Sequence, residues 1–448
     1  MKPMRTTTVL IAAVVVALAA GCGGSDDSGG SSSGGTVTLR YAMWDEVQKP
    51  PIERSLAEFA KRHPSIKVSI ELNAWENYWS KLQTQLAGGK APDVFWNHVS
   101  YFPRFSEQNV LTDLTPDINA DKLDTSIYDP KLANVWKVEG KTYGLPKDWD
   151  TIGLFYSTKA LQDTGMTPAD LADLSWNPVD GGTFVKALQR LTVDAHGNHP
   201  TEAGFDAKKV KRYGIALQAP TGQQHWWNFA LQNGCRLQDR AFGRWTIDQP
   251  ACVQAIQFVQ DLFQKYQVAV PASVTNPPNG PSLDQVVGRG QAATAMEGSW
   301  MLRAFNTALP KGGFGVADLP AGPVGKGSVY NGLSEAIYAG TKHKKEAWEL
   351  VKWLASPESQ RIITEAGTVW PGISGLNDTF VRAWKAKGVD VTGFQKAAAG
   401  TTMSFPLTKS SSVYVEKSLD IFNQVWLGKL TPRQAATRIN TESNNAIQ

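Results

Sequence analysis

The stretch GKTYGLPKDWDTIGLFYST, residues 140–158, organises this chain of 448 residues. Residues 151–156 are nearly continuously apolar, which is typical of a strand covered on both faces. Just before them, Pro146, Lys147 and Asp148 interrupt the apolar pattern. We therefore predict a buried strand that crosses from one half of the molecule into the other, with a hinge at the interruption.

Upstream of this stretch, strand patterns alternate with helix patterns. Strands are predicted at 36–44, 66–72 and 93–96, and helices at 51–63 and 78–86. This order favours a parallel sheet, whose strands end at a common edge where ligands bind. The side chains expected at that edge include Trp44, Asp45, Trp75, Trp96, Asn97 and His98.

Four motifs carry a family resemblance: GGKAPDVFW at 88–96, YGLP at 143–146, QAATAMEGSW at 291–300 and FGVADLPAGP at 314–323. With them the chain resembles the extracellular solute-binding proteins, family 1, the group that includes maltose-binding protein. The resemblance implies an α/β fold of the periplasmic-binding-protein-like type II, with two discontinuous α/β lobes joined by hinge crossovers. The expected division puts residues 36–148 and 334–385 in lobe 1, and residues 149–333 and 386–448 in lobe 2.

The amino terminus predicts export. Lys2 and Arg5 precede an apolar run at 9–20, and small residues then lead directly to Cys22. Residues 1–21 resemble a bacterial lipoprotein signal peptide, although Ala19 replaces the usual Leu; the alternative is an ordinary signal peptide with an incidental cysteine. We expect a protein lipidated at Cys22 and anchored to the outer face of the bacterial cell membrane, with residues 22–35 as a flexible Gly/Ser tether.

Composition narrows the function classes. The hydrophobic content of 42% and charged content of 19% are those of a globular protein, and the net charge of +4 comes without a basic block, so no nucleic-acid partner is expected. The Gly-rich run at 321–328 lacks the spacing of a phosphate-binding loop. His196 and His199 lack a third metal ligand nearby, so we predict neither a metal nor another cofactor.

Cys235 and Cys252 are separated by 17 positions. In an oxidising compartment such a pair favours a disulfide over two free thiols, and it would add about 3 kcal/mol of stability. A redox or metal role would require CxxC-like spacing or a nearby histidine.

The chain has 16 tryptophans, and their positions are the main evidence for a ligand site. Helical spacing places Trp348, Trp353, Trp384 and Trp426 in the core. Others stand at strand ends, turns or helix starts, where packing explains them less well. The resemblance implies these ligand-binding residues: Trp44, Asp45, Trp75, Asn97, His98, Asp148, Asp150, Trp226, Trp227, Trp300, Arg303, Tyr330, Asn331, Glu335 and Trp370.

Carboxylates and indoles together favour a sugar or oligosaccharide, because carboxylates accept hydrogen bonds from hydroxyls and indoles pack on pyranose rings. The resemblance implies a monomeric binding protein, not an enzyme, that delivers its ligand to the permease of an ABC importer. Val99 and Ser100 depart from the maltose-binding pattern, so maltose itself is not specified. Two alternatives stay open: another polar solute, such as a glycerophosphodiester or a polyamine, and a secreted glycosidase with acids among Asp148, Asp150 and Glu297.

Overall fold

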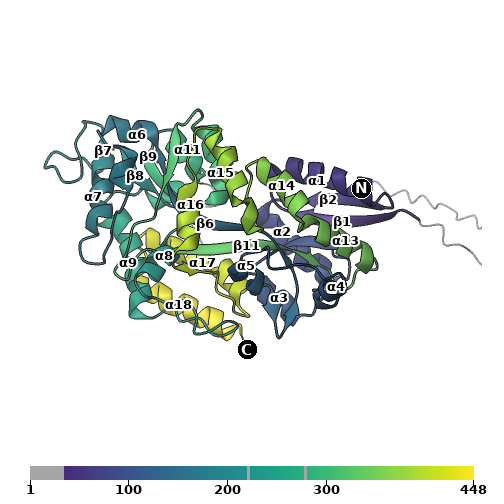
Figure 1. Cartoon of the computed structure of the whole chain (residues 1–448). Helices are drawn as coiled ribbons and strands as arrows, with labels where there is room; N and C mark the ends of the chain where they lie inside the picture. The colour runs from purple at the N-terminus through teal and green to yellow at the C-terminus, as the bar shows by residue number, and fades with distance from the viewer. Residues whose placement is uncertain (1–34, 219–221, 277–279, 448) are drawn as a thin grey trace, which may run out of the picture. The chain divides into compact units, whose positions relative to one another are not determined.

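The computed structural model describes residues 35–218, 222–276 and 280–447 (Figure 1). The predicted signal peptide, Cys22 and most of the tether lie outside these residues. Within the folded unit Thr36–Gln448, eight strands form a continuous sheet path in the order β2-β1-β3-β11-β6-β9-β8-β7. Their bounds are β1 Val37–Met43, β2 Ile66–Leu72, β3 Val94–His98, β6 Leu145–Ser157, β7 Val193–Asp194, β8 Val210–Ala216, β9 Ala292–Gly298 and β11 Ser328–Ile337.

The first part of the sheet is parallel, as predicted: β1 pairs in parallel with both β2 and β3. Four helices cover this part: α1 Lys49–Arg62, α2 Trp75–Ala87, α13 Lys344–Leu354 and α14 Pro357–Glu365. Helices α1 and α13 contact its strands, α14 packs on α1 and α13, and Tyr78 of α2 donates to the Trp96 backbone oxygen at 2.8 Å. Helix α2 begins at Trp75, so that tryptophan opens a helix instead of ending a strand.

Strands β6 and β11 lie side by side at the centre of the sheet and run antiparallel (Figure 1). The predicted interruption at residues 146–148 does not end the strand, since β6 is continuous through them. The register instead shifts there: Leu333 pairs with Asp148 and Ser334 with Pro146, which leaves Lys147 as an extra residue. A bulge of this kind tolerates the proline, which has no N–H to donate to the ladder.

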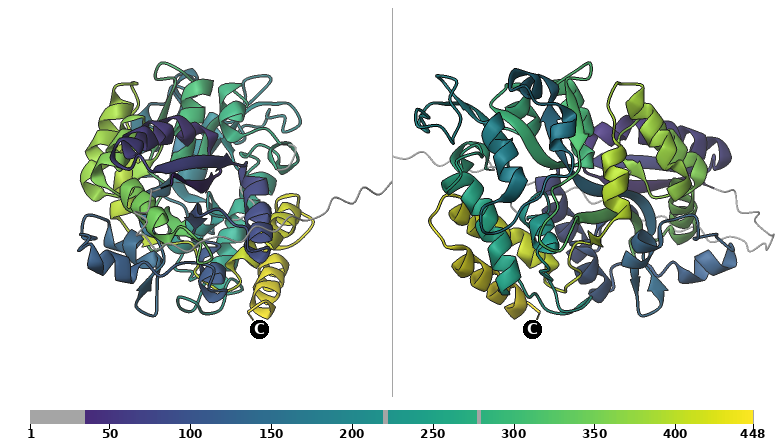
Figure 2. Two further views of the ribbon diagram at one scale, coloured as in Figure 1. Left: turned by 90° about the vertical axis from the view of Figure 1, so that its right-hand side faces the viewer. Right: turned by 60° about the vertical axis from the view of Figure 1, so that its left-hand side comes forward.

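The far part of the sheet continues from β6 through β9, which is antiparallel to β6 and parallel to β8. Helix α7 Gly182–Leu191 packs on β8, and α8 Trp226–Gln232 packs on α9 Pro250–Gln264. The closing helices α17 Ser411–Trp426 and α18 Pro432–Asn445 lie side by side against α9 (Figure 2). All four tryptophans assigned to the core by helical spacing are buried.

The remaining elements are short. They are η1 Glu46–Gln48, α3 Phe102–Glu107, α4 Thr115–Ala120, α5 Pro130–Val135, β4 Lys137–Val138, β5 Lys141–Thr142, α6 Thr158–Asp163, η2 Pro168–Leu171, α10 Ala272–Thr275, α11 Leu283–Gly288, η3 Ser299–Met301, α12 Leu302–Ala308, β10 Phe314–Ala317, β12 Trp370–Pro371, η4 Ser374–Leu376, α15 Asn377–Lys385, α16 Thr392–Ala399 and β13 Thr402–Met403. Among the described residues, no helix has both the length and the apolar content needed to span a bilayer.

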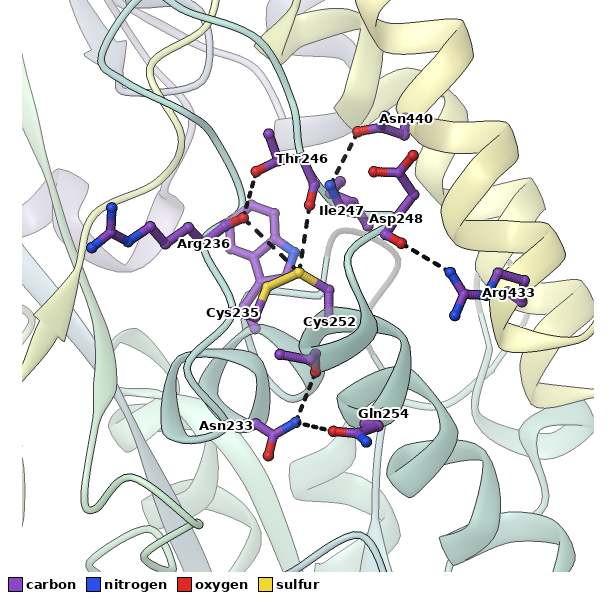
Figure 3. Close-up of a disulfide and its surroundings, with 12 residues drawn as sticks. Asn233, Cys235, Arg236, Thr246, Ile247, Asp248, Cys252, Gln254, Arg433 and Asn440 are labelled. Atoms are coloured by element: carbon purple, nitrogen blue, oxygen red, sulfur yellow. Dashed lines mark hydrogen bonds between the residues drawn. A yellow bond between two sulfur atoms is a disulfide. The ribbon is translucent and has the colours of Figure 1, made fainter.

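The structure contains the predicted disulfide between Cys235 and Cys252 (Figure 3). It joins the chain just after α8 to the first turn of α9. Beside it, the Asn233 side chain donates to the backbone oxygen of Ala251 and to Gln254, with 2.9 Å for each contact. The bond therefore reinforces a junction between α8 and α9 that side-chain contacts already define.

Candidate ligand-binding site

The crossing strands sort the candidate residues onto two faces of the sheet. Paired residues of an antiparallel ladder point to the same face. Asn331 pairs with Asp150, and Leu333 pairs with both Asp148 and His98. We call the face that carries Asp148, Asp150, His98 and Asn331 the front face.

The opposite, back face carries Trp149 and Tyr330. Trp370 stacks on Trp149 with 4.6 Å between ring centroids and is fully buried. The Tyr330 hydroxyl donates to Asp129 at 3.1 Å. Contrary to the expectation from the sequence, Tyr330 and Trp370 therefore lie away from the front face, and we leave them out of the candidate site.

An aromatic cluster stands at the carboxyl ends of the first three strands. The ring of Trp44 lies 5.2 Å from Trp75 and 4.9 Å from Trp96, each in an edge-on arrangement, and Trp75 lies 5.3 Å from His98. Trp96 is fully buried, whereas Trp44 and Trp75 are only partly buried. Trp44 and Trp75 therefore keep indole surface that a ligand could cover.

His98 and Asp45 border this cluster. Nδ1 of His98 lies 2.7 Å from the Ser100 hydroxyl, and burial lowers the pKa of His98 to about 3, so the ring is neutral at physiological pH. Asp45 caps η1, since its carboxylate accepts from the Val47 N–H and from the Gln48 side chain, each at 2.8 Å. A neutral imidazole can form a hydrogen bond with a hydroxyl group of a ligand. The Asp45 carboxylate, in contrast, already accepts hydrogen bonds within its own loop.

Two acids have strongly raised pKa values. Burial, and secondarily the charge of Asp148, raises the pKa of Asp150 to about 8, while the Gln223 side chain donates to it at 3.2 Å. Burial also raises the pKa of Glu297 to about 8, although this carboxylate accepts from the Gly298 N–H at 3.1 Å. Neither carboxyl has enough hydrogen-bond donors nearby to offset the cost of burying its charged form. A ligand with several donors would supply them.

Asp148 and Glu335 already interact with other side chains of the protein. The Lys147 ammonium lies 2.5 Å from Asp148 and 2.7 Å from the Gln48 side-chain oxygen, all three being buried. Glu335 accepts from the Tyr41 hydroxyl at 2.7 Å, and burial raises its pKa to about 7. The bulge at Lys147 thus supports a buried polar network, so we assign Asp148 and Glu335 a structural role.

The other residues expected in the site differ in how exposed their side chains are. Trp226 and Trp227 are fully buried in α8, and Asn97 is fully buried in register with Ser334, which removes all three from direct ligand contact in this conformation. The Asn331 side-chain oxygen accepts from the Phe405 N–H at 2.6 Å. Trp300 is partly buried in η3, directly after β9, and Arg303 is exposed on α12.

Two front-face contributors were missed by sequence reasoning. Gln223 reaches Asp150 from the turn before α8, and Phe405 places its ring 5.7 Å from His98 and 4.7 Å from Trp227. The position of Gln223 in a turn between β8 and α8 is the signal that could have indicated it. No local pattern marks Phe405, because its neighbours are brought to it only by the tertiary fold.

Metal binding has no support in the part of the chain that the structure describes. There, no group of three or more His, Cys, Asp or Glu side chains could hold a metal ion. What the front face offers is partly covered indole surface, a neutral imidazole and, in Asp150, a carboxyl with a raised pKa, whereas Glu297 pairs with Gly153 and lies on the back face.

The sequence of this chain matches a known family. The family described as bacterial extracellular solute-binding protein matches residues 55–389, which is well over half of the chain. The chain belongs to this family. In its sheet β11 lies antiparallel between β3 and β6, and the fold is that of the type II periplasmic binding proteins, built from two discontinuous α/β lobes.

Two solved structures illustrate the likeness of this solute-binding protein to known members. UspC of M. tuberculosis is 28% identical with a TM-score of 0.74, covering 92% of this chain and 100% of that one. The ABC substrate-binding protein Lmo0181 of Listeria monocytogenes, solved with cycloalternan, is 22% identical with a TM-score of 0.79, covering 92% and 99%. The latter shows the fold alone.

Curated relatives include sugar-binding proteins. A lactose-binding protein of Rhizobium radiobacter is 29% identical over 163 residues, 34% of this chain and 37% of that protein, so the match spans little more than a third of that relative. A galactooligosaccharide-binding protein of Bacillus subtilis is 23% identical over 400 residues, 88% of this chain and 86% of that protein.

Proposed function

We propose that this solute-binding protein captures a sugar or oligosaccharide outside the cell and delivers it to the membrane permease of an ABC importer. It acts as a monomer, lipid-anchored to the outer face of the bacterial cell membrane through Cys22, and it does not alter its ligand. The names of the lactose- and galactooligosaccharide-binding relatives support the ligand class.

The observation that carries the proposal is the pairing of partly exposed indoles with a buried carboxyl of raised pKa. Trp44 follows β1, Trp75 opens α2 just after β2, and Trp300 follows β9 of lobe 2. Asp150 has a pKa raised to about 8, because burial disfavours its charged form. Sugar hydroxyls would donate to this carboxyl, and pyranose faces would cover the indoles.

Capture follows from hinge closure about β6 and β11. A ligand held by one lobe supplies contacts that the other lobe lacks, so closure is favoured when the site is filled. Moving the population from 1:99 to 99:1 requires roughly 5.5 kcal/mol of differential affinity. A few stacked rings and charge-assisted hydrogen bonds reach this magnitude.

A cationic solute such as a polyamine is the second candidate, because Asp150 would also bind an ammonium group. A glycerophosphodiester fits less well, since a phosphate group would need arginine, lysine or a helix amino terminus. A glycosidase would need two acids that act on one bond, whereas Asp150 and Glu297 lie on opposite faces of the sheet.

The test is a thermal-shift panel of mono-, di- and trisaccharides, putrescine, spermidine and glycerophosphocholine, with product analysis of each saccharide that binds. We expect a saccharide to raise Tm and to be recovered intact. If only the polyamines raise Tm, the ligand is a polyamine and not a saccharide. If the saccharide is recovered cleaved, the protein is a hydrolase and not a binding protein.

A further inference from the structure

One bulky residue of lobe 2 has a strained backbone. Phe242 has φ +57°, in the left-handed region that residues with large side chains rarely adopt. Its loop is held by Asp239, whose carboxylate accepts from the N–H groups of Arg240 at 2.7 Å and Arg244 at 2.8 Å. The Phe242 N–H donates to the Leu407 oxygen at 2.5 Å. The surroundings therefore impose this conformation.

The strained residue points its ring at the other lobe. Phe242 lies edge-on to Phe102, with 6.4 Å between ring centroids, and Phe102 is the fully buried first residue of α3. Glycine would occupy the same backbone position without strain, but it would lose this contact. The strain is thus associated with a contact between the lobes.

Two further contacts reach the same short part of lobe 1. Phe405 lies edge-on to His98 at 5.7 Å, and the Lys409 ammonium lies 2.6 Å from the Glu107 carboxylate. Together with Phe102, these partners fall within residues 98–107, the end of β3 and all of α3.

The lobe 2 side of these contacts is a single unit. The Trp245 indole donates to the Ser410 hydroxyl at 3.1 Å and stacks on Tyr414 at 4.4 Å, which ties the loop of Phe242 to the segment that carries Phe405 and Lys409. The three contacts can therefore form or break together.

We propose that Phe242, Phe405 and Lys409 form a clasp that closes on His98, Phe102 and Glu107 and holds the lobes together without ligand. None of the six residues belongs to the crossing strands, so these contacts separate when the lobes swing apart. The clasp sets the fraction of closed protein and thereby the apparent ligand affinity. This role rests on the proposed hinge closure, but the contacts can be tested with no ligand present.

The first test compares Phe242→Gly with Lys122→Gly by solution scattering and hydrogen exchange on the full chain. Lys122 is an exposed lobe 1 residue that also has positive φ, +49°, so its variant controls for relief of backbone strain. We expect Phe242→Gly to increase the radius of gyration and to raise exchange across residues 98–107 and 222–228 by roughly two- to tenfold, the range for loss of one aromatic pair. An unchanged radius, with faster exchange only in the 239–244 loop, would overturn the clasp.

The second test reverses the ion pair. Lys409→Glu places two carboxylates together and should open the lobes, as measured by the radius of gyration, whereas Lys409→Glu with Glu107→Lys should restore the wild-type value. A single variant with the wild-type radius, or a double variant that stays as open as the single one, would contradict the ion pair's part in the clasp. Because no ligand is used, these outcomes do not depend on which solute the protein binds.

Discussion

The side chain of Gln223 donates a hydrogen bond to Asp150, with 3.2 Å between Nε2 and Oδ1, and thereby joins the turn before α8 to the crossing strand β6. Asp150 lies on the front face, near the point where the sheet passes from one lobe to the other. A ligand that binds this carboxyl would therefore act directly on the crossing strand.

Asp150 should make stability depend on pH. Its pKa is raised from about 4 to about 8, so the folded protein holds this proton more tightly than the unfolded chain, and stability falls as pH rises between these values. Asp150→Asn should raise the free energy of unfolding at pH 8 by on the order of 1–3 kcal/mol and flatten its decline from pH 5 to 8. Urea denaturation at several pH values measures this.

The matched control is Asp420→Asn, at an exposed position on α17, which should leave the pH profile unchanged. Asp150→Asn should also weaken ligand binding about tenfold or more, because the amide cannot ionise to the carboxylate that several hydrogen-bond donors of a ligand would stabilise. A variant that keeps both the wild-type pH slope and the wild-type affinity would remove Asp150 from the site.

Trp300 and Trp370 should respond in opposite ways to substitution. Trp300→Ala should weaken ligand binding with little loss of stability, because the indole is only partly buried. Trp370→Ala should cost about 3–5 kcal/mol of stability, because it deletes a fully buried ring stacked on Trp149. Fluorescence titration and denaturant unfolding separate the two effects; unchanged affinity in Trp300→Ala would exclude that indole.

The buried ion pair at the bulge should be sensitive to loss of one partner. Lys147→Met leaves Asp148 buried without its cation and should cost about 3–5 kcal/mol. Lys352→Met, which removes a partly exposed pair with Asp121, should cost at most about 1 kcal/mol. Similar losses in the two variants, measured by urea denaturation, would argue against a structural role for the Lys147 network.

Removing the disulfide should lower stability without abolishing the fold. Cys235→Ala with Cys252→Ala opens a link across 17 positions and should cost about 3 kcal/mol. The side-chain contacts of Asn233 across the same junction should preserve the position of α8. Circular dichroism should therefore show the same secondary structure at a lower Tm, and loss of the folded spectrum at 25 °C would contradict this.

The sequence predicted the first three strands, the helices between them and the core tryptophans, because apolar periodicity reports directly which face of an element is buried. It placed the interruption of β6 correctly but did not show that the interruption is a bulge. Local pattern shows that Pro146 and Lys147 disturb a strand, whereas the partner strand decides whether the ladder continues around them.

The site was less predictable than the fold. Trp44 and Trp75 were correctly placed near His98, since strand ends of a parallel sheet converge. Trp226 and Trp370 were equally strong candidates by sequence, but both are fully buried. The burial of a helix start or a short strand depends on elements far away in sequence. The strand-face assignment of Tyr330 likewise required the register of β11 against β6.

The central claim is that this solute-binding protein closes on a saccharide held between indoles and carboxyls. Isothermal titration calorimetry of the purified protein with lactose, galactooligosaccharides, maltotriose and cycloalternan tests it most directly. The account predicts saturable binding of one equivalent of at least one of these sugars, weakened in Trp300→Ala and retained in Lys352→Met. Absence of heat with every saccharide, alongside saturable binding of a polyamine, would contradict it.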